Sequence, residues 1–565
     1  MTETSWSEVD VAIIGAGLAG MSLAIQLTQR RPAARVCIFE RARFPVPEAV
    51  HKVGESTIEV GAHYFANVLG LNHALRPAKL PKLGLRFVFN PGDNPPFEQR
   101  PEVGQAHFPV VHTYNFDRGR MENILYEQCR RQGVNIVDGA AVDAIELGTT
   151  AHVLSCARGE HGERVSARWV VDASGRRGLL KQKLRLSEAS RHHVNATWFR
   201  VDDAIAIDDA SRAEHWQRRV PFGLRKLSTT HLMGCGYWVW LIPLASGSTS
   251  VGIVADEQIH PVVERNSFDK ALAWLALHEP QCAEMVAHRR GRLQDFLVLK
   301  RLSYGCREVF SHRRWALTGE AGVFLDPFYS PGSDFIAYAN DYITALVERD
   351  LCGQDIAQAA SQFNEAYLNL FESWLNVYHG QYPLMANARV FSAKIVWDFA
   401  IYWGASALIY FQRKLTDLDF GIATFTLRSS FHRLHQQAQR FFQWWHARDP
   451  GQAPQGAHLD YLSVEFLYAW QTALNERLDD VQLRAALERN LRVCENLLRF
   501  LYARATGSQA GLQPDDPRID PYALRLDDSP RVPSAPERFD LAGELNLFVS
   551  RVCSARSTQP LLQHG

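Results

Sequence analysis

Apolar and polar positions along the first 175 residues predict strand, glycine turn, helix and strand. Residues 11–14 form an apolar run that ends in glycines, residues 21–29 carry apolar side chains at helical spacing, and residues 35–39 form a second apolar run. A later apolar run at 169–171 also ends in turn residues. Strands that alternate with helices in this way predict an α/β fold with a parallel sheet.

The pattern changes between about residues 190 and 310. Shorter β-type runs, such as 237–244 and 249–254, are separated by Gly and Ser, which predicts an antiparallel sheet inserted between two parts of the α/β fold. Residues 314–350 return to strand, turn and helix. We therefore expect residues 1–350 to form one domain, with the inserted sheet on its substrate side.

Helical periodicity dominates from residue 351 onward. Five aromatic residues recur at spacings of four, four, three and four, which favours a core-facing stripe over a cofactor site: Phe363, Tyr367, Phe371, Trp374 and Tyr378. A second helical block runs over 462–503, and a stretch rich in Pro, Asp, Gly and Ser at 505–539 is typical of a linker. We expect residues 351–565 to form a mostly helical region that covers the substrate, with four further aromatic residues on its substrate side: Trp397, Tyr402, Trp403 and Tyr410.

Composition and charge indicate a globular protein without a polyanionic partner. Hydrophobic residues make up 46%, and 61 Lys and Arg balance 61 Asp and Glu, which leaves no net charge to attract nucleic acid. The nine cysteines are scattered without metal-ligand spacing, so we expect free thiols, no metal site and a cytoplasmic protein. The apolar segment 395–411 is too short for a bilayer and contains Asp398. This favours a buried helix over one that lies on a membrane surface, and no integral membrane segment is expected.

The glycines after the first strand predict a dinucleotide site. Gly15, Gly17 and Gly20 follow the strand with G-x-G-x-x-G spacing and lead into the helix. Gly15 permits the tight turn, Gly17 lets the backbone approach a pyrophosphate, and Gly20 lets helix and strand pack closely. Glu40 ends the second strand, where a carboxylate can accept hydrogen bonds from the adenosine ribose hydroxyls.

Two later segments favour FAD as the dinucleotide. Residues 170–175 and 315–321 resemble segments of the glutathione-reductase and aromatic-hydroxylase type of flavoprotein, in which the second carries an acid to the ribityl chain. The resemblance implies four further cofactor-binding residues: Asp172, Gly175, Gly319 and Glu320. Asp is more common than Glu at position 320. No second complete glycine fingerprint for NADPH is present in the sequence, so electrons are expected to arrive with the flavin itself or from a partner.

Four motifs resemble those of the flavin-dependent halogenases. Residues 238–243 are similar to the W-x-W-x-I-P signature and residues 324–332 to the F-x-x-P-x-x-S-x-G signature. Residues 82–87 look like the segment with the catalytic lysine, and residues 54–57 look like the flavin strap. Each pattern alone is typical of ordinary packing, but the combination over roughly residues 10–350 carries the resemblance. It implies catalytic roles for Lys82, Trp238, Trp240, Tyr329 and Ser330, flavin contacts at Gly54, Glu55, Ser56 and Pro327, and halide contacts at Ser330 and Gly332.

The resemblance also implies which chemical step each residue serves. In that family, reduced FAD and oxygen give a flavin hydroperoxide, halide attacks it, and the resulting hypohalous acid travels to the substrate. Trp238 and Trp240 would keep the substrate from the peroxide. Lys82 would bind the hypohalous acid by a hydrogen bond or as a haloamine and present halogen to the ring. Lys79 is the alternative, and only the K-L-G-L-R-F pattern favours Lys82.

Two positions depart from the family pattern. Tyr329 stands where tryptophan halogenases carry a glutamate before the signature serine, which disfavours free tryptophan and favours a phenol or pyrrole. Pro331 lies between Ser330 and Gly332, and proline has no backbone N–H to donate to a halide.

The sequence therefore predicts FADH2- and O2-dependent chlorination or bromination of an electron-rich aromatic ring, phenolic or pyrrolic and free or carrier-tethered. The expected partner is a separate flavin reductase. An FAD-dependent monooxygenase or dehydrogenase and a non-catalytic flavin-binding subunit are the alternatives.

Overall fold

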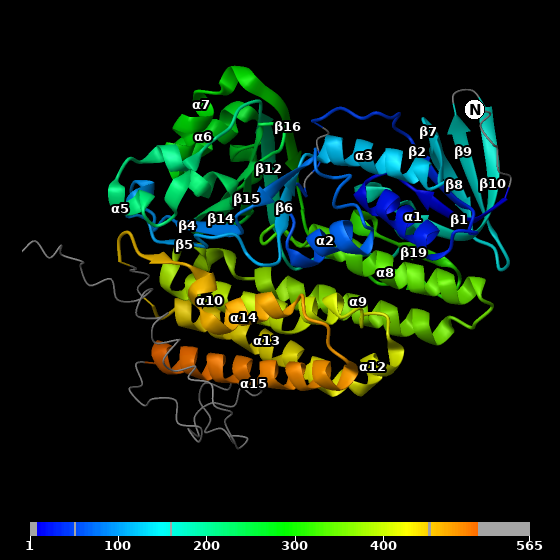
Figure 1. The fold of residues 1–565 in the computed structure, drawn as a ribbon. Helices are drawn as coiled ribbons and strands as arrows, with labels where there is room; N and C mark the ends of the chain where they lie inside the picture. The colour runs from blue at the N-terminus through cyan, green and yellow to red at the C-terminus, as the bar shows by residue number, and fades with distance from the viewer. Residues whose placement is uncertain (1–7, 50–51, 53, 159–160, 450–453, 507–565) are drawn as a thin grey trace, which may run out of the picture.

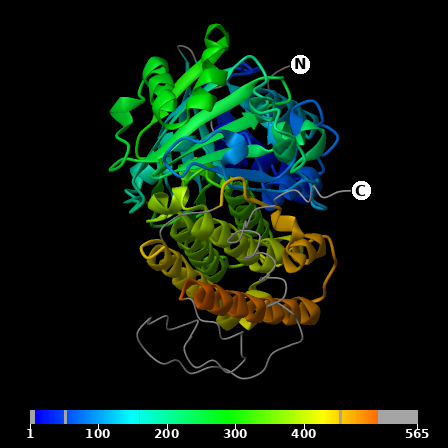
Figure 2. The same ribbon diagram turned by 90° about the vertical axis from the view of Figure 1, so that its left-hand side faces the viewer.

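Two β-sheets stand side by side on a layer of helices (Figure 1). The computed structural model describes residues 8–49, 52, 54–158, 161–449 and 454–506, so the predicted linker lies outside the described residues from position 507 onward. A view turned by 90° shows the same helical layer beneath both sheets (Figure 2).

The first sheet has the Rossmann-type order that the alternating pattern predicts. β1 pairs in parallel with β10 on one side and with β2 on the other, and α1 follows the glycine turn. Its strands are β1 (Glu8–Ile14), β2 (Val36–Glu40), β7 (Asn135–Asp138), β8 (Ala141–Glu146), β9 (His152–Arg158), β10 (His161–Asp172), β18 (Phe310–Ser311) and β19 (Trp315–Leu317). The helices α1 (Leu18–Arg30), α3 (Arg118–Arg131) and α8 (Gly332–Leu351) pack around it.

The second sheet is larger than the insert predicted at 190–310. The strands within 190–310 pair antiparallel with one another, as predicted. Three further strands come from elsewhere in the chain, and one of them, β4, pairs in parallel with β13. An apolar run such as 85–89 predicts a strand but not its distant partner. In spatial order the strands are β16 (Leu293–Leu299), β12 (Val194–Val201), β15 (Thr249–Asp256), β14 (Tyr237–Pro243), β13 (Thr229–Gly234), β4 (Leu85–Phe89), β5 (Glu102–Gly104) and β20 (His458–Leu459).

The helical layer contains α9 (Ala357–Tyr378), α10 (Ala388–Ile401), α11 (Ala407–Phe411), α12 (Leu418–Ala423), α13 (Phe425–His446), α14 (Glu465–Ala473) and α15 (Asp480–Ala505). The block expected at 462–503 is thus two helices, because Asp479 and Gln482 form a capping box that starts α15 afresh. A π-helical turn, Tyr402–Ser406, joins α10 to α11. Within the described residues, no helix combines the length and apolar character needed to cross a membrane.

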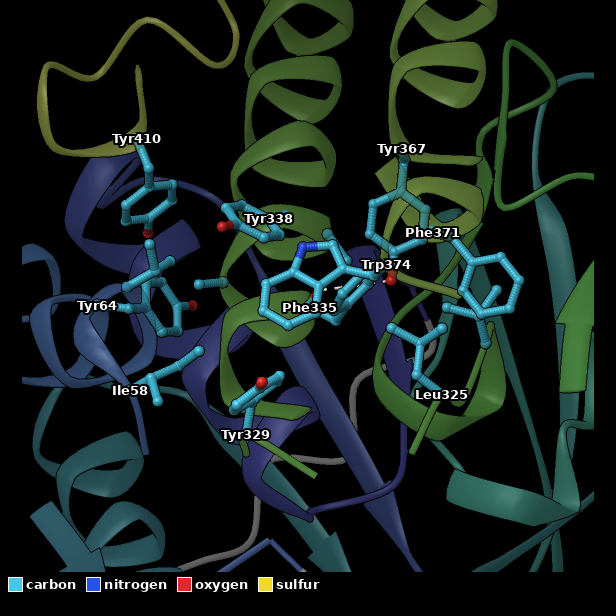
Figure 3. Close-up of a cluster of buried hydrophobic side chains, with 14 of the residues drawn as sticks. Ile58, Tyr64, Leu325, Tyr329, Phe335, Tyr338, Tyr367, Phe371, Trp374 and Tyr410 are labelled. Atoms are coloured by element: carbon cyan, nitrogen blue, oxygen red, sulfur yellow. Dashed lines mark hydrogen bonds between the residues drawn. The ribbon is translucent and has the colours of Figure 1, made fainter. Parts of the chain in front are cut away.

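Aromatic side chains bind the helical layer to α8. The predicted stripe on α9 is buried throughout, and Figure 3 shows Tyr367, Phe371 and Trp374 gathered around Phe335 of α8. The ring centroids of Phe335 and Tyr367 lie 5.7 Å apart, with the rings nearly perpendicular. This packing fixes the start of α8, which lies at the junction of the three layers.

Candidate active site

A cavity of about 550 Å³ runs along the carboxyl ends of the parallel strands. Its walls include the turn after β1, the end of β2, residues 54–56, the inner face of β14 and the turn before α8. Cofactor sites typically span roughly 300–1,000 Å³ and form at this edge of an open α/β sheet.

Each fingerprint glycine has its own structural reason. Gly15 has φ +108°, and a Cβ there would lie 2.5 Å from the Ala173 carbonyl oxygen. A Cβ on Gly20 would overlap the Gly15 carbonyl oxygen, so Gly20 serves the packing of α1 and does not line the cavity. A Cβ on Gly17 would meet no protein atom within 4 Å. The space beside Gly17 is therefore open to a ligand.

Acidic side chains line the cavity at the end of β2 and just after β19. Glu40 accepts hydrogen bonds from the amides of Ala16 at 2.7 Å and Ala42 at 2.8 Å while it lines the cavity. Gly319 and Glu320 line it from the end of β19, and burial raises the pKa of Glu320 against the opposing effect of nearby basic side chains.

Asp172 is fully buried beside the cavity and is not part of its wall. Its carboxylate accepts hydrogen bonds from the amides of Ser174 at 2.9 Å and Leu180 at 2.7 Å. These two hydrogen bonds hold the turn that brings Gly175 to the cavity, and direct contact of Asp172 with the cofactor stays a prediction.

Basic side chains in the cavity wall were missed by the motif analysis. They are suited to a pyrophosphate, and no local sequence pattern distinguishes them from surface residues: Arg41, Lys52, Arg118, Arg176 and Arg177. The open space at Gly17, the carboxylate of Glu40 and this basic wall together fit FAD.

The strap residues Gly54, Glu55 and Ser56 also line the cavity. Burial raises the pKa of Glu55 to about 7, although Ser250 and the nearby Arg200 oppose the shift. The side chain of Ser56 points toward Lys82, because its Oγ accepts a hydrogen bond from the Lys82 amine.

Lys82 is buried between the cavity and a second pocket. Its Nζ donates to Ser56 Oγ at 2.9 Å and to the Thr57 carbonyl oxygen at 2.7 Å. Desolvation lowers the pKa of Lys82 to about 7, while the negative charges of Glu59 and Asp334 act in the opposite direction. Lys79 is half-buried, donates to Asn72 and lies in neither of these spaces. Of the two candidate lysines, Lys82 lines the second pocket and Lys79 does not.

Polar side chains form a continuous chain from the cavity to Lys82. Ser56 Oγ and Thr229 Oγ1 lie 2.9 Å apart, and Thr229 donates to Asn115 Oδ1 at 3.0 Å. Ser56 and Thr229 line the cavity, whereas Lys82 lines the second pocket. These hydrogen bonds connect the wall of the cavity to the Lys82 amine.

The second pocket lies between the two sheets and the helical layer. It encloses about 60 Å³, enough for water, which needs roughly 10–15 Å³. Six side chains characterise its wall: Lys82, Glu59, Tyr329, Trp374, Tyr402 and Trp403. Trp397 instead donates to His435, and Tyr410 packs on Tyr338. Two of the four aromatics expected on the substrate side, Tyr402 and Trp403, therefore reach the pocket.

Aromatic rings separate the two spaces. Trp238 and Trp240 line the cavity, and their centroids lie 5.6 Å apart. Trp238 packs on Phe328 at 5.3 Å, and Phe328 packs on Tyr329 at 4.3 Å. Because Tyr329 lines the second pocket, Trp238, Phe328 and Tyr329 form a row of contacting rings between the two spaces.

The turn before α8 is strained and rich in candidate anion donors. Tyr329 and Ser330 both have left-handed backbones, with φ +68° and +65°, an uncommon conformation for non-glycine residues. The Ser330 amide donates to the Pro327 carbonyl oxygen at 2.8 Å, which commits it to the turn. Gly332 and Ser333 line the cavity as the first two residues of α8, where helix amides have no intrahelical partner.

The fold and the cavity fit an FAD-dependent oxidoreductase, with a second pocket beside the cavity. A profile of the family described as tryptophan halogenase matches residues 93–383, and one for an NAD(P)-binding Rossmann-like domain matches residues 13–76. The first match covers more than half of the chain, which therefore belongs to the tryptophan halogenase family and is a flavin-dependent halogenase.

Individual relatives agree with this assignment. Flavin-dependent halogenase chlA of Dictyostelium discoideum is 25% identical over 424 residues, which cover 70% of this chain and 69% of the relative. The 1H-pyrrole-2-carbonyl-[peptidyl-carrier protein] chlorinase of Pseudomonas fluorescens is 26% identical over 349 residues, which cover 58% and 72%. The structure of halogenase PltM with phloroglucinol and FAD shares the fold, with a TM-score of 0.60 at 17% identity over 88% of this chain and 98% of PltM.

Proposed function

We propose that this enzyme chlorinates or brominates a phenolic or pyrrolic ring in the second pocket, with Lys82 as the residue that transfers the halogen. One observation carries the proposal: Lys82 is fully buried, lines the pocket and is hydrogen bonded to the strap that lines the flavin cavity. A buried amine at this junction can receive a small oxidant from one side and present it to a ring on the other.

Reduced FAD, supplied by a separate reductase, provides the oxidising chemistry with oxygen when bound. The chain's own residues bind halide and guide the oxidised product. The amides of Gly332 and Ser333 are oriented by α8 to hold halide, since helix N-termini favour anions. Ser56 and Thr229 then offer hydrogen bonds to hypohalous acid on its way to Lys82, while Trp238 and Phe328 exclude the larger aromatic substrate from the flavin cavity.

The substrate would be an aryl group that carries a larger apolar or carrier-linked portion. A groove of about 710 Å³ lies among α8, α9, α12 and α13, and it shares three wall residues with the second pocket: Ser373, Ile401 and Ser406. Ile422 and Phe425 in the wall of this groove are 60% and 63% exposed. The groove supports access to the closed pocket from the helical side.

Halide-dependent product mass tests the proposed function. Wild-type enzyme with FADH2 from a reductase, oxygen and either chloride or bromide should add one halogen to simple phenols or pyrroles. Added oxygen without halogen would instead indicate a monooxygenase. Tight flavin binding without any product from these substrates would indicate a non-catalytic flavin-binding subunit.

A further inference from the structure

Glu59 and Lys82 share the second pocket without forming an ion pair with each other. Glu59 begins the short helix α2 (Glu59–His63) and lies in the wall with Lys82. Each influences the other's protonation, yet the Lys82 amine donates to Ser56 and Thr57. A carboxyl group and an amine thus face a common space that an aromatic ring must enter.

Glu59 differs from the other acidic residues around this pocket. Asp398, the second acid in the wall, accepts hydrogen bonds from Lys394, Gln439 and Tyr329. These donors hold Asp398 in a structural network.

Asp334, behind the wall, is occupied in a similar way. It accepts from the Gly61 amide at 2.7 Å and from the Tyr402 hydroxyl at 2.6 Å. The carboxyl group of Glu59 lines the pocket and has three hydrogen-bonding neighbours: its own backbone amide, the indole of Trp403 and the amide of Gln471. Since a carboxylate has about four acceptor positions, Glu59 retains capacity for a ligand.

The surroundings make Glu59 a stronger base than an exposed glutamate. Burial raises its pKa, while Trp403, Lys82 and Gln471 act against this shift. A higher carboxyl pKa comes closer to that of a phenol, near 10, and favours proton transfer between them. The titratable groups that act on Glu59 or respond to its charge come from four elements: Lys82 (β3, Lys79–Lys82), Asp334 (α8), Tyr402 (π-helical turn) and Tyr461 (Tyr461–Ser463).

We propose that Glu59 is a catalytic base that accepts the hydroxyl proton of a phenolic substrate while Lys82 delivers halogen to a ring carbon ortho or para to that hydroxyl. This inference rests on the proposed function and narrows its substrate class to phenols. Tyr329 itself is a poor candidate for the base, because its hydroxyl donates to Asp398 at 3.0 Å.

The step balances as phenol plus hypohalous acid gives halophenol plus water. The ring carbon forms a bond to halogen, the halogen–oxygen bond breaks, and the departing hydroxide takes a proton from the Lys82 ammonium group. The phenol proton moves to Glu59, which leaves a dienone. The neutral Lys82 amine then removes the ring C–H proton, and Glu59 returns its proton to the ring oxygen.

Resorcinol and its dimethyl ether form a matched pair for the test, because both rings are electron-rich and only resorcinol has hydroxyl protons. Glu59→Gln should lower kcat for resorcinol by about 10²- to 10⁴-fold, the usual range for a lost general base. It should leave the slower reaction of 1,3-dimethoxybenzene, FAD affinity and flavin oxidation unchanged. Glu59→Asp should recover part of the resorcinol rate.

The pH profile gives a second readout. In wild type, the resorcinol rate should rise with pH as Glu59 loses its proton, and Glu59→Gln should abolish this rise. Glu465→Gln, at an exposed carboxyl on α14, is the matched control and should behave like wild type. Equal losses for resorcinol and its ether in Glu59→Gln, or no loss for either, would overturn the role of Glu59. If wild type halogenates neither compound but does halogenate a pyrrole, the phenol inference fails and the proposed function stands; no halogenated product from any substrate contradicts both.

Discussion

The flavin cavity and the second pocket differ in almost every physical property. The first is wide, at about 550 Å³, and lined by glycines and basic side chains. The second encloses about 60 Å³ and is walled by aromatic rings around one lysine and one glutamate. An aromatic partition separates them, and the hydrogen bonds of Ser56 link them.

This difference would let one chain form the oxidant in one space and bind the aromatic substrate in the other. The wide cavity suits a large charged cofactor. The small pocket leaves little room for water beside a bound ligand. In the proposed mechanism, hypohalous acid passes along the hydrogen bonds of Ser56, while the aromatic wall excludes a ring. Selectivity then depends on the wall and on Lys82, and each can be changed separately.

The largest expected effect comes from closing the flavin cavity alone. Gly17→Val should reduce FAD affinity on the order of 10³-fold, equivalent to about 4 kcal/mol, because the new side chain fills space that no protein atom occupies. The fold should persist for the same reason. Titration of flavin fluorescence measures the affinity. Gly291→Val, at an exposed glycine with equally open surroundings, serves as the control, and retained flavin in Gly17→Val would refute the site.

A substitution in the turn before α8 should improve halide binding. Pro331→Thr restores a backbone donor, and Pro331 already has helical angles (φ −77°, ψ −6°) that threonine tolerates. A hydrogen bond to an anion contributes about 1.5–3 kcal/mol, so the halide concentration for half-maximal rate should fall by about ten- to a hundredfold. Steady-state kinetics in chloride and bromide measure it. Unchanged halide dependence would place the halide away from this turn.

Ser56→Ala interrupts the polar path without touching the pocket wall. Loss of one hydrogen bond to Lys82 should lower the yield of halogenated product per reduced flavin by roughly tenfold, which corresponds to about 1.4 kcal/mol. The missing product should appear as hypohalous acid captured by a diketone trap in solution. A variant with normal yield would mean that the oxidant takes another route.

Ile401→Ala should produce the smallest effect. Ile401 belongs to the wall shared by the second pocket and the neighbouring groove, and its truncation should widen the opening between them. We expect KM for bulky phenols to fall a few-fold, by about 1 kcal/mol or less, with kcat for resorcinol unchanged. A rise in KM for bulky substrates would contradict access from this side.

The same comparison explains what the sequence could predict. Gly15, Gly17 and Glu40 lie within one strand–turn–helix–strand unit, so their spacing alone predicts the cavity and its fold. The second pocket joins residues from distant parts of the chain, such as Glu59, Lys82 and Tyr402. No local period brings these together. Lys82 was predictable only through its motif, and Glu59 was missed because a single glutamate after the strap is typical of a helix start.

Asp172 shows another limit of prediction from sequence. Sequence similarity predicts that its segment lies at the cofactor site, but it does not predict the hydrogen bonds that the carboxylate makes to the backbone. Here two amides occupy it. The extension of the second sheet beyond its predicted antiparallel part was missed because the pairing of β4 with β13 joins strands more than a hundred residues apart.

A single-turnover experiment on Lys82→Met tests most directly whether oxidation and transfer occupy separate spaces. Methionine keeps the volume of the side chain but removes its hydrogen bonds to Ser56 and Thr57. With reduced flavin, oxygen and bromide, flavin oxidation should proceed at the wild-type rate, halogenated substrate should disappear, and hypobromous acid should reach a solution trap. Lys79→Met should resemble wild type. Halogenated substrate at the wild-type yield from Lys82→Met, or loss of flavin oxidation together with product, would contradict the account.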